Sequence, residues 1–251
     1  MFRPRIIPVL LLKDLALVKS VRFKDHKYIG DPINAVKIFN DLKADELVFL
    51  DIEASRNRTS ISLDFVRDVG EEAFMPFSVG GGIDSMEKIK AILAAGAEKV
   101  IINTKAGQDP VFIKEASEAF GSSTIVVCMD VKKKLFKGER TWIASGSRST
   151  KYTPLEFARL MEANGAGELI VQSIERDGTM NGYDVDLIRS IATSVSMPVV
   201  ALGGAGSKED LADAYRNGEA NALAAGSLFV YQDKKRGVLI NYPEKKELSF
   251  D

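Results

Sequence analysis

The chain has 251 residues, of which 45% are hydrophobic and 27% charged, and its formal net charge is −1. This composition is typical of a soluble globular protein, and the near-zero charge gives no reason to expect binding to nucleic acid or to an anionic membrane. No apolar run approaches the about 18 residues that a membrane span needs, and no signal-peptide core follows the basic start. We expect a cytoplasmic protein whose residues 1–251 form one domain.

The predicted elements alternate between short apolar strands and amphipathic helices. The predicted strands are residues 5–12, 46–51, 77–79, 100–103, 124–129, 169–173, 199–202 and 222–226. The predicted helices are residues 32–42, 61–72, 86–95, 111–119, 154–164, 185–194 and 208–216. Buried strands separated by helices pair in parallel through crossovers. Eight such units in a chain of this length predict an α/β fold, a closed (β/α)8 TIM barrel.

Residues 131–146 interrupt the alternation after the fifth predicted strand. They contain the lysines 132–134 and a turn at Lys137-Gly138, which together predict an inserted β-hairpin on the active face. The lysines form either a solvated face or a contact for a phosphate or a partner. Residues 21–30 are assigned to a long loop after the first strand.

An internal repeat relates the two halves of the chain. Residues 75–85 and 197–207 each run from Met-Pro through a short apolar strand into a glycine turn and a serine that can cap a helix, at an offset of 122 residues. The repeat predicts two duplicated half-barrels, about 1–120 and 121–251. Backbone N–H groups of glycine turns can approach an anion, so it also predicts two phosphate sites at the barrel mouth.

The chemistry available to the chain is restricted by its single cysteine, Cys128, and its single histidine, His26. These residues exclude an intrachain disulfide and leave almost no material for a zinc site or a Ser-His-Asp triad. We therefore expect no metal and no cofactor. Catalysis would use carboxylates, and Asp130 and Asp177, which follow two predicted strands, are the acid/base candidates. Either aspartate could instead cap a loop or hold a lysine.

Several blocks of the sequence resemble the HisF family, the cyclase subunit of imidazole glycerol phosphate synthase. They are residues 5–8, 45–51, 79–83, 165–168 and 176–179, and the resemblance is collinear over residues 1–230. It implies a lyase built on a half-barrel-duplicated (β/α)8 fold with a bis-phosphate ligand. It also implies a glutamine amidotransferase complex, in which a HisH-like glutaminase at the barrel bottom supplies ammonia through the barrel.

The resemblance also implies roles for individual residues. The implied phosphate-binding residues are Gly82, Asn103, Thr104, Gly204, Gly226 and Ser227, and the implied catalytic residues are Asp130 and Asp177. The implied substrate pocket contains Leu11, Lys19, Asp51 and Thr179. The implied gate for ammonia is a charged ring of Arg5, Glu46, Lys99 and Glu168, all at predicted strand starts. Without the resemblance, such a ring is only a plug that stabilises the barrel.

The chain departs from the family at strand 1, where the family's catalytic aspartate is replaced by Leu11. The internal repeat shows the same difference, because residues 6–13 align with residues 125–132 and place Leu11 opposite Asp130. The serine usual after strand 7 is replaced by Leu202. The leucine-rich first strand, residues 30–41 and the tail 238–243 are similar to a divergent WbuZ-type branch of HisF-like proteins. That branch is associated with acetamidino modification of aminosugars in bacterial surface polysaccharides, with a sugar amidotransferase as a further partner.

Three hypotheses follow. The chain is an ammonia-handling subunit for sugar amidination that binds a phosphorylated small molecule. Alternatively, it is a true cyclase of histidine biosynthesis in which Asp14 or Asp177 replaces the missing acid. In the third hypothesis it is a non-catalytic barrel that activates its glutaminase partner. Leu11 favours the first and third hypotheses, and the intact glycine turns favour the first and second.

Overall fold

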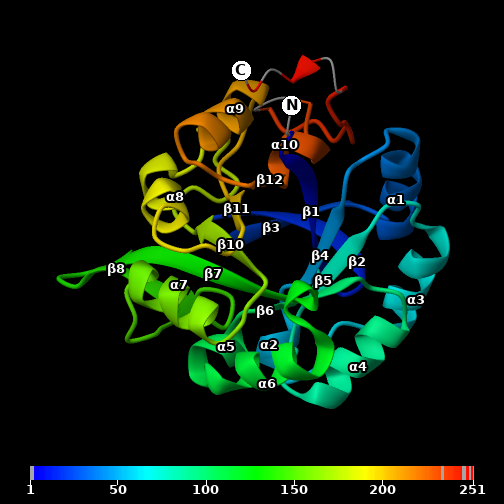
Figure 1. Ribbon diagram of the computed structural model, residues 1–251. Helices are drawn as coiled ribbons and strands as arrows, with labels where there is room; N and C mark the ends of the chain where they lie inside the picture. Colours follow the sequence, from blue (N-terminus) through cyan, green and yellow to red (C-terminus); the bar gives the residue numbers. More distant parts are fainter. Residues whose placement is uncertain (1–2, 233–234, 245–246, 249, 251) are drawn as a thin grey trace.

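A computed structural model describes residues 3–232, 235–244, 247–248 and 250. Eight parallel strands close into a barrel, and helices surround it (Figure 1). In order around the barrel the strands are β1 (Arg5–Lys13), β4 (Leu47–Asp51), β5 (Phe77–Gly80), β6 (Lys99–Ile102), β7 (Ile125–Lys134), β10 (Glu168–Ser173), β11 (Val199–Leu202) and β12 (Ala222–Ala225). Because β12 pairs with β1 and β7 pairs with β10, the ring has no open edge. The predicted (β/α)8 fold is confirmed.

The longer helices occupy the predicted segments. They are α1 (Pro32–Asp41), α3 (Leu63–Glu72), α4 (Met86–Ala94), α6 (Val111–Phe120), α7 (Pro154–Ala163), α8 (Val185–Ala192) and α9 (Lys208–Arg216). Ser85 and Ser207, at matched positions of the repeat, each accept a backbone N–H as N-caps. The short helices α2 (Ala54–Asn57), α5 (Thr104–Gln108) and α10 (Ser227–Val230) and the 3-10 turn η1 (Ser122–Thr124) were not predicted. None of the helices in the described ranges combines the length and apolar character needed to span a membrane.

Alternation along the strands divides the apolar side chains into two cores. On β1, Ile6 and Leu10 pack outward into the layer between strands and helices. Ile7, Val9 and Leu11 instead point into the barrel. The interior cluster continues with Val18, Val48, Ile101, Val126, Cys128, Ile170, Val200, Leu202, Ala222 and Ala224. The barrel interior is therefore an apolar column, as is usual in this fold.

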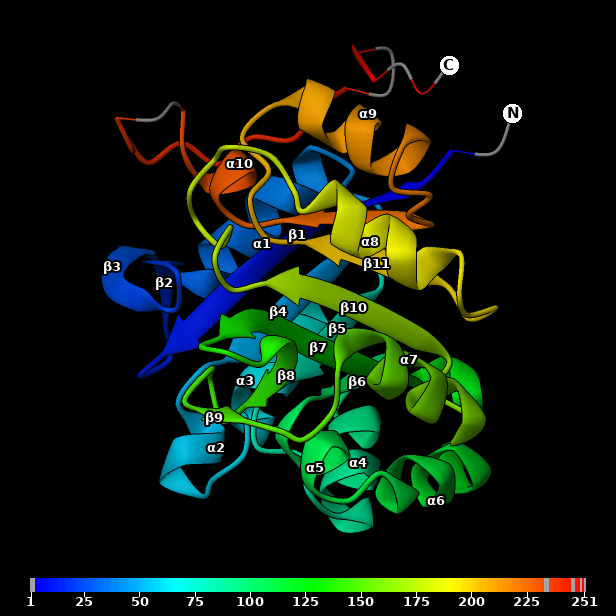
Figure 2. The ribbon, with the colours of Figure 1, turned by 90° about the vertical axis from the view of Figure 1, so that its left-hand side faces the viewer.

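Two hairpins extend the barrel at the carboxyl ends of its strands (Figure 2). The predicted hairpin after strand 5 is confirmed, because β7 continues into antiparallel β8 (Gly138–Ile143) and then β9 (Arg148–Ser149). The assignment of residues 21–30 to a loop was wrong. Residues 16–30 form the antiparallel pair β2 (Ala16–Val21) and β3 (Lys24–Gly30). Its turn holds Arg22 and Phe23 at positive φ, where asparagine and glycine would have been the recognisable signal.

The eighth βα unit lacks a long helix. After the single turn of α10, the described residues 231–232, 235–244, 247–248 and 250 contain no α-helix. An extended tail covers this position instead, and Tyr242 packs against Phe229 with ring centroids 5.6 Å apart. The Tyr242 hydroxyl donates to the carbonyl of Ile6 and accepts the N–H of Asp45, both at 3.1 Å. The tail thus connects α10 to β1 and to the loop before β4.

Candidate functional site

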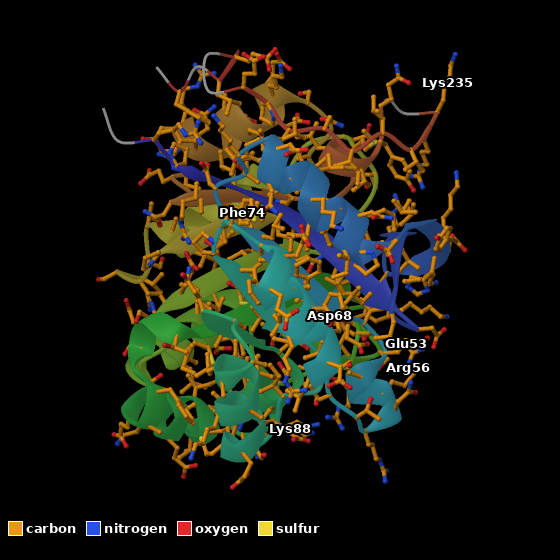
Figure 3. All side chains as sticks on the ribbon, turned by 90° about the vertical axis from the view of Figure 1, so that its right-hand side faces the viewer. Glu53, Arg56, Asp68, Phe74, Lys88 and Lys235 are labelled. Atoms are coloured by element: carbon orange, nitrogen blue, oxygen red, sulfur yellow. The ribbon has the colours of Figure 1, made fainter. Side chains whose placement is uncertain are left out.

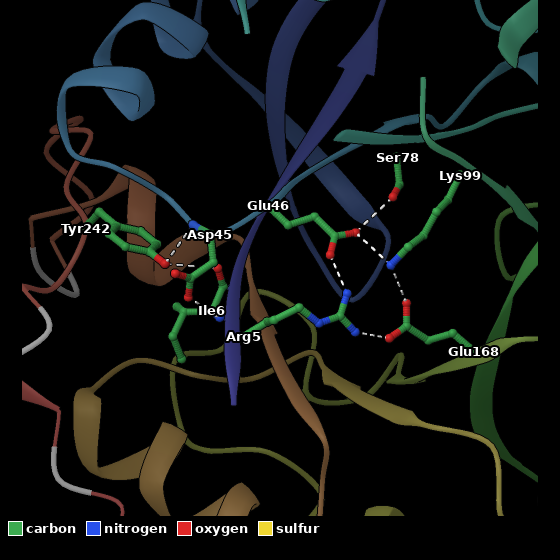
Figure 4. A network of polar contacts seen from close by, with 8 residues as sticks. All are labelled: Arg5, Ile6, Asp45, Glu46, Ser78, Lys99, Glu168 and Tyr242. Atoms are coloured by element: carbon green, nitrogen blue, oxygen red, sulfur yellow. Dashed lines mark hydrogen bonds and ion pairs between the residues drawn. The ribbon is translucent and has the colours of Figure 1, made fainter. Parts of the chain in front are cut away.

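A closed ring of charges lies at the amino end of the barrel (Figure 4). Arg5 forms ion pairs with both Glu46 and Glu168. Lys99 completes the ring, with Nζ 3.4 Å from Glu46 and 3.1 Å from Glu168. Ser78 donates a further hydrogen bond to Glu46 at 2.9 Å. The two carboxylates are almost fully buried, so each depends on both cations for its solvation.

The carboxyl end of the barrel carries the main cavity, with a volume of about 450 Å³. Of the predicted site residues it is lined by Leu11, Asp51, Gly82, Asn103, Thr104 and Asp130. These come from β1, β4, β5, β6 and β7 or the loops after them, which are mostly elements of the first half-barrel. The volume lies within the range of small-molecule sites.

Five further predicted residues line a much smaller pocket of about 20 Å³. Its lining includes Lys19, Asp177, Gly204, Gly226 and Ser227. Leu11 and Gln172 line both pockets and therefore form the wall between them. The structure thus brings the predicted residues to one face but divides them into two sites.

Besides the charged ring, Thr179 and Asp14 lie outside both pockets. Thr179 lines neither, and its hydroxyl donates to the carbonyl of Arg176 at 2.7 Å. Asp14 lies in the exposed turn between β1 and β2 at a φ of 50° and also lines neither pocket. Asp14 is therefore not placed to replace a missing acid.

The two glycine turns have matching geometry. A Cβ on Gly82 would lie 1.9 Å from the carbonyl oxygen of Thr59, and one on Gly204 would lie 2.1 Å from that of Gly182. Both glycines also have positive φ. In each half, the backbone of another loop therefore packs directly over the turn, and no side chain fits there.

Asp130 is buried at the floor of the main cavity. Its carboxyl group accepts from Asn103 Nδ2 at 3.3 Å and from the Cys128 thiol at 3.6 Å. Burial raises the pKa of Asp130 to about 8; the thiol opposes this shift, and the charge of Asp177 adds to it. Asp130 therefore holds a proton at neutral pH and can act as a general acid.

Asp177 and Lys19 form the polar centre of the small pocket. Asp177 accepts from the Ser20 hydroxyl at 2.8 Å and from the Phe23 N–H at 3.2 Å, which fastens the β2–β3 hairpin to the loop after β10. Burial raises the pKa of Asp177, and nearby Lys19 opposes that shift. Burial likewise lowers the pKa of Lys19 to about 8, against the attraction of Asp177.

The burial of Asp130 predicts a specific dependence of stability on pH. An unfolded aspartate loses its proton near pH 4, whereas folded Asp130 keeps it to about pH 8. The unfolded chain therefore binds fewer protons over this interval, and Asp130 lowers the free energy of unfolding by up to about 1.4 kcal/mol per pH unit as pH rises. Asp130→Asn lacks this dependence. Urea titrations at several pH values from 5 to 8 give the free energy of unfolding of both proteins. The value for the variant should rise steadily relative to that of the wild type as pH increases, and a constant difference would contradict the assignment.

Sequence reasoning missed several residues that line the main cavity. Arg56 and Arg58 come from α2 and its C-cap, while Phe23 and His26 come from the β2–β3 hairpin. The arginines were visible as a basic pair directly after strand 2. The sequence carries no signal for the place of Phe23 and His26, because the turn of that hairpin has neither glycine nor asparagine.

The fold and the site define a (β/α)8 barrel with a charged ring at one end and glycine turns at the other. A family model described as "Histidine biosynthesis protein" matches residues 5–235. A Pseudomonas aeruginosa protein named "Putative imidazole glycerol phosphate synthase subunit hisF2" is 46% identical over 248 residues, covering 99% of both chains. The "Imidazole glycerol phosphate synthase subunit HisF" of a Nostoc species is 42% identical, covering 99% of this chain and 97% of its own. The chain belongs to the HisF family of histidine biosynthesis proteins.

Proposed function

We propose that this chain is the synthase subunit of a glutamine amidotransferase. It receives ammonia from a HisH-like glutaminase at the barrel bottom and serves the acetamidino modification of an aminosugar in surface polysaccharide biosynthesis. The observation that carries the proposal is Leu11, which lines the main cavity together with Asp130. The internal repeat aligns these two positions, so the first half-barrel has a leucine where the second has a buried acid. The WbuZ-type likeness of the first strand and of the tail supports the sugar role.

The barrel axis supports the transfer of ammonia. Arg5, Glu46, Lys99 and Glu168 close the amino end, and the apolar column above them reaches Leu11 and Leu202 at the carboxyl end. Apolar walls favour neutral ammonia over the ammonium ion, because a buried charge without a partner is costly. We propose that the ring is the gate of this path.

The carboxyl end supports binding of a phosphorylated ligand. Gly82, Asn103 and Thr104 line the main cavity, and we propose that they hold a phosphate. Gly204, Gly226 and Ser227 are a second candidate set at the small pocket. In this proposal Asp130 acts as an acid, and Asp177 orients the β2–β3 hairpin.

Reconstitution with a HisH-type glutaminase and a sugar amidotransferase tests the function. We expect the chain to stimulate glutamine hydrolysis and to make sugar amidination depend on glutamine. Cyclisation of the histidine-pathway bis-phosphate with ammonium salt should be about 10²–10⁴-fold slower than an ordinary rate. Cyclisation at an ordinary rate would establish the histidine-biosynthesis alternative. Stimulation of hydrolysis with all ammonia released to solution would establish a non-catalytic activator. Either result overturns the proposal.

A further inference from the structure

We infer that the main cavity binds a diphosphate ester, with one phosphate at the Gly81-Gly82 turn and the adjoining phosphate on Arg56 and Arg58. This inference rests on the proposed function only for the statement that the cavity takes a phosphorylated ligand. It decides between the two candidate phosphate sets: both anionic groups lie next to each other in the first half-barrel, and the set at the small pocket is not used.

The segment that carries the two arginines is fixed to the barrel. The Asp51 carboxylate accepts the backbone N–H groups of Glu53 and Ala54, both at 3.0 Å, and so orients the start of α2. From the other side, Ser145 donates its hydroxyl to the carbonyl of Ile52 at 2.6 Å. Figure 3 shows Glu53 and Arg56 at the same end of the molecule as the β2–β3 hairpin.

The end of α2 places its second arginine beside the glycine turn. Arg58 ends the helix in the left-handed conformation, with φ of 56°. The next carbonyl, that of Thr59, packs against Gly82 so closely that no Cβ fits, and the N–H of Ile61 donates to the carbonyl of Gly81 at 3.0 Å. The residue that follows Arg58 is therefore in direct contact with the glycine turn.

The two guanidinium groups are available for an anion. Neither Arg56 nor Arg58 has an ion pair or side-chain hydrogen bond to any other described residue. The other charges at the rim are already engaged: Glu53 pairs with Lys13 at 3.1 Å, Asp84 with Lys88 at 2.7 Å, Lys105 with Asp109 at 2.9 Å, and Asp51 caps α2. The planar guanidinium fork matches phosphate oxygens in a bidentate way, so two free arginines beside one phosphate turn suit a second phosphate.

The small pocket offers no comparable room. Its volume of about 20 Å³ is far below the about 450 Å³ of the main cavity. The Lys19 ammonium fills the space, since Nζ donates to the carbonyl of Val9 at 3.3 Å and lies 1.8 Å from where a Cβ on Gly226 would stand. A phosphate could enter only after the Lys19 side chain had left, and Leu11 separates the two pockets.

The remaining walls indicate what the diphosphate is attached to. Phe23 and His26 bring two aromatic rings from the β2–β3 hairpin to the same cavity, and Leu50 and Ile52 add apolar surface. Aromatic side chains stack well on planar bases. A nucleoside diphosphate or its sugar ester therefore fits this cavity in charge, in ring content and in size.

Calorimetric titration of the full chain shows whether the cavity prefers ligands with adjacent phosphates or ligands with distant ones. The probes are orthophosphate, pyrophosphate, uridine diphosphate and fructose 1,6-bisphosphate, whose phosphates lie at opposite ends. We expect pyrophosphate and uridine diphosphate to bind at least about tenfold more tightly than orthophosphate, the gain of one charge-assisted bidentate contact. The double variant Arg56→Gln/Arg58→Gln should lose that advantage and keep its affinity for orthophosphate.

Arg67→Gln is the matched control. It removes one arginine charge from α3, where Arg67 is exposed and pairs with Asp64, so its affinities should equal those of the wild type. Tighter binding of fructose 1,6-bisphosphate than of pyrophosphate would overturn the inference, as would an unchanged pyrophosphate advantage in the double variant or equal losses in Arg67→Gln. If sugar amidination still depends on the chain in those cases, only the inference fails. If the chain cyclises the histidine-pathway substrate instead, the proposed function fails.

Discussion

Leu11→Asp is expected to raise turnover of the histidine-pathway bis-phosphate, supplied with ammonium salt at high pH, by about 10²–10⁴-fold over the wild type. The gain is that of one general acid/base group. Leu11 lines the main cavity together with Asp130, and the internal repeat aligns these two positions, so the new carboxylate completes a pair. A steady-state assay of the purified variant checks the result.

The control for this substitution is Leu11→Asn, which has nearly the same shape as aspartate and cannot exchange a proton. It should show no gain. Leu11 is only 8% exposed, so both polar variants lose stability, and urea unfolding must show that each is folded under assay conditions. Ordinary turnover by the wild type, or equal gains in both variants, would show that the missing carboxylate is not what limits cyclisation.

Removing one cation from the charged ring is expected to destabilise the barrel strongly. In Lys99→Met, the buried carboxylates of Glu46 and Glu168 would share Arg5 alone. Breaking a buried ion pair by deleting one partner leaves an uncompensated charge and costs about 3–5 kcal/mol. The free energy of unfolding from urea titration at neutral pH should fall by that amount.

Lys114→Met serves as the comparison for the ring variant. Lys114 lies 3.9 Å from Glu118 on α6, and both side chains are well exposed, so its loss should change the free energy of unfolding by less than about 1 kcal/mol. Similar losses in Lys99→Met and Lys114→Met would mean that water solvates the ring carboxylates. The proposed gate would then be open to solvent.

The barrel strands could be predicted from the sequence because each is a short apolar run ended by turn residues. The predicted and observed ends of the strands agree within one or two residues, with one exception. The fifth strand ends later than predicted, because it continues into the hairpin. The β2–β3 hairpin escaped detection for a local reason. Its second strand is mostly exposed and charged, and both of its turns place residues such as Leu15 and Phe23 at positive φ without glycine.

The site was predictable only to the level of strand ends. Placing Arg5, Glu46, Lys99 and Glu168 at strand starts was enough to predict that they share one end of the barrel. The small size of the second pocket depends on the path of a single side chain, Lys19, into it. No pattern in the sequence specifies that rotamer, nor the way α2 turns back over the Gly81-Gly82 turn.

The eighth βα unit, which lacks a long helix, is covered differently from the other seven. Every other barrel strand is followed by a helix of at least two turns, whereas β12 is followed by α10 and an extended tail held by contacts such as those of Tyr242. Segments with fewer packed neighbours form the cooperative units that unfold first. We therefore expect the tail over β12 and β1 to open before the strands themselves, because the ladder between these two strands is as long as that between β10 and β11.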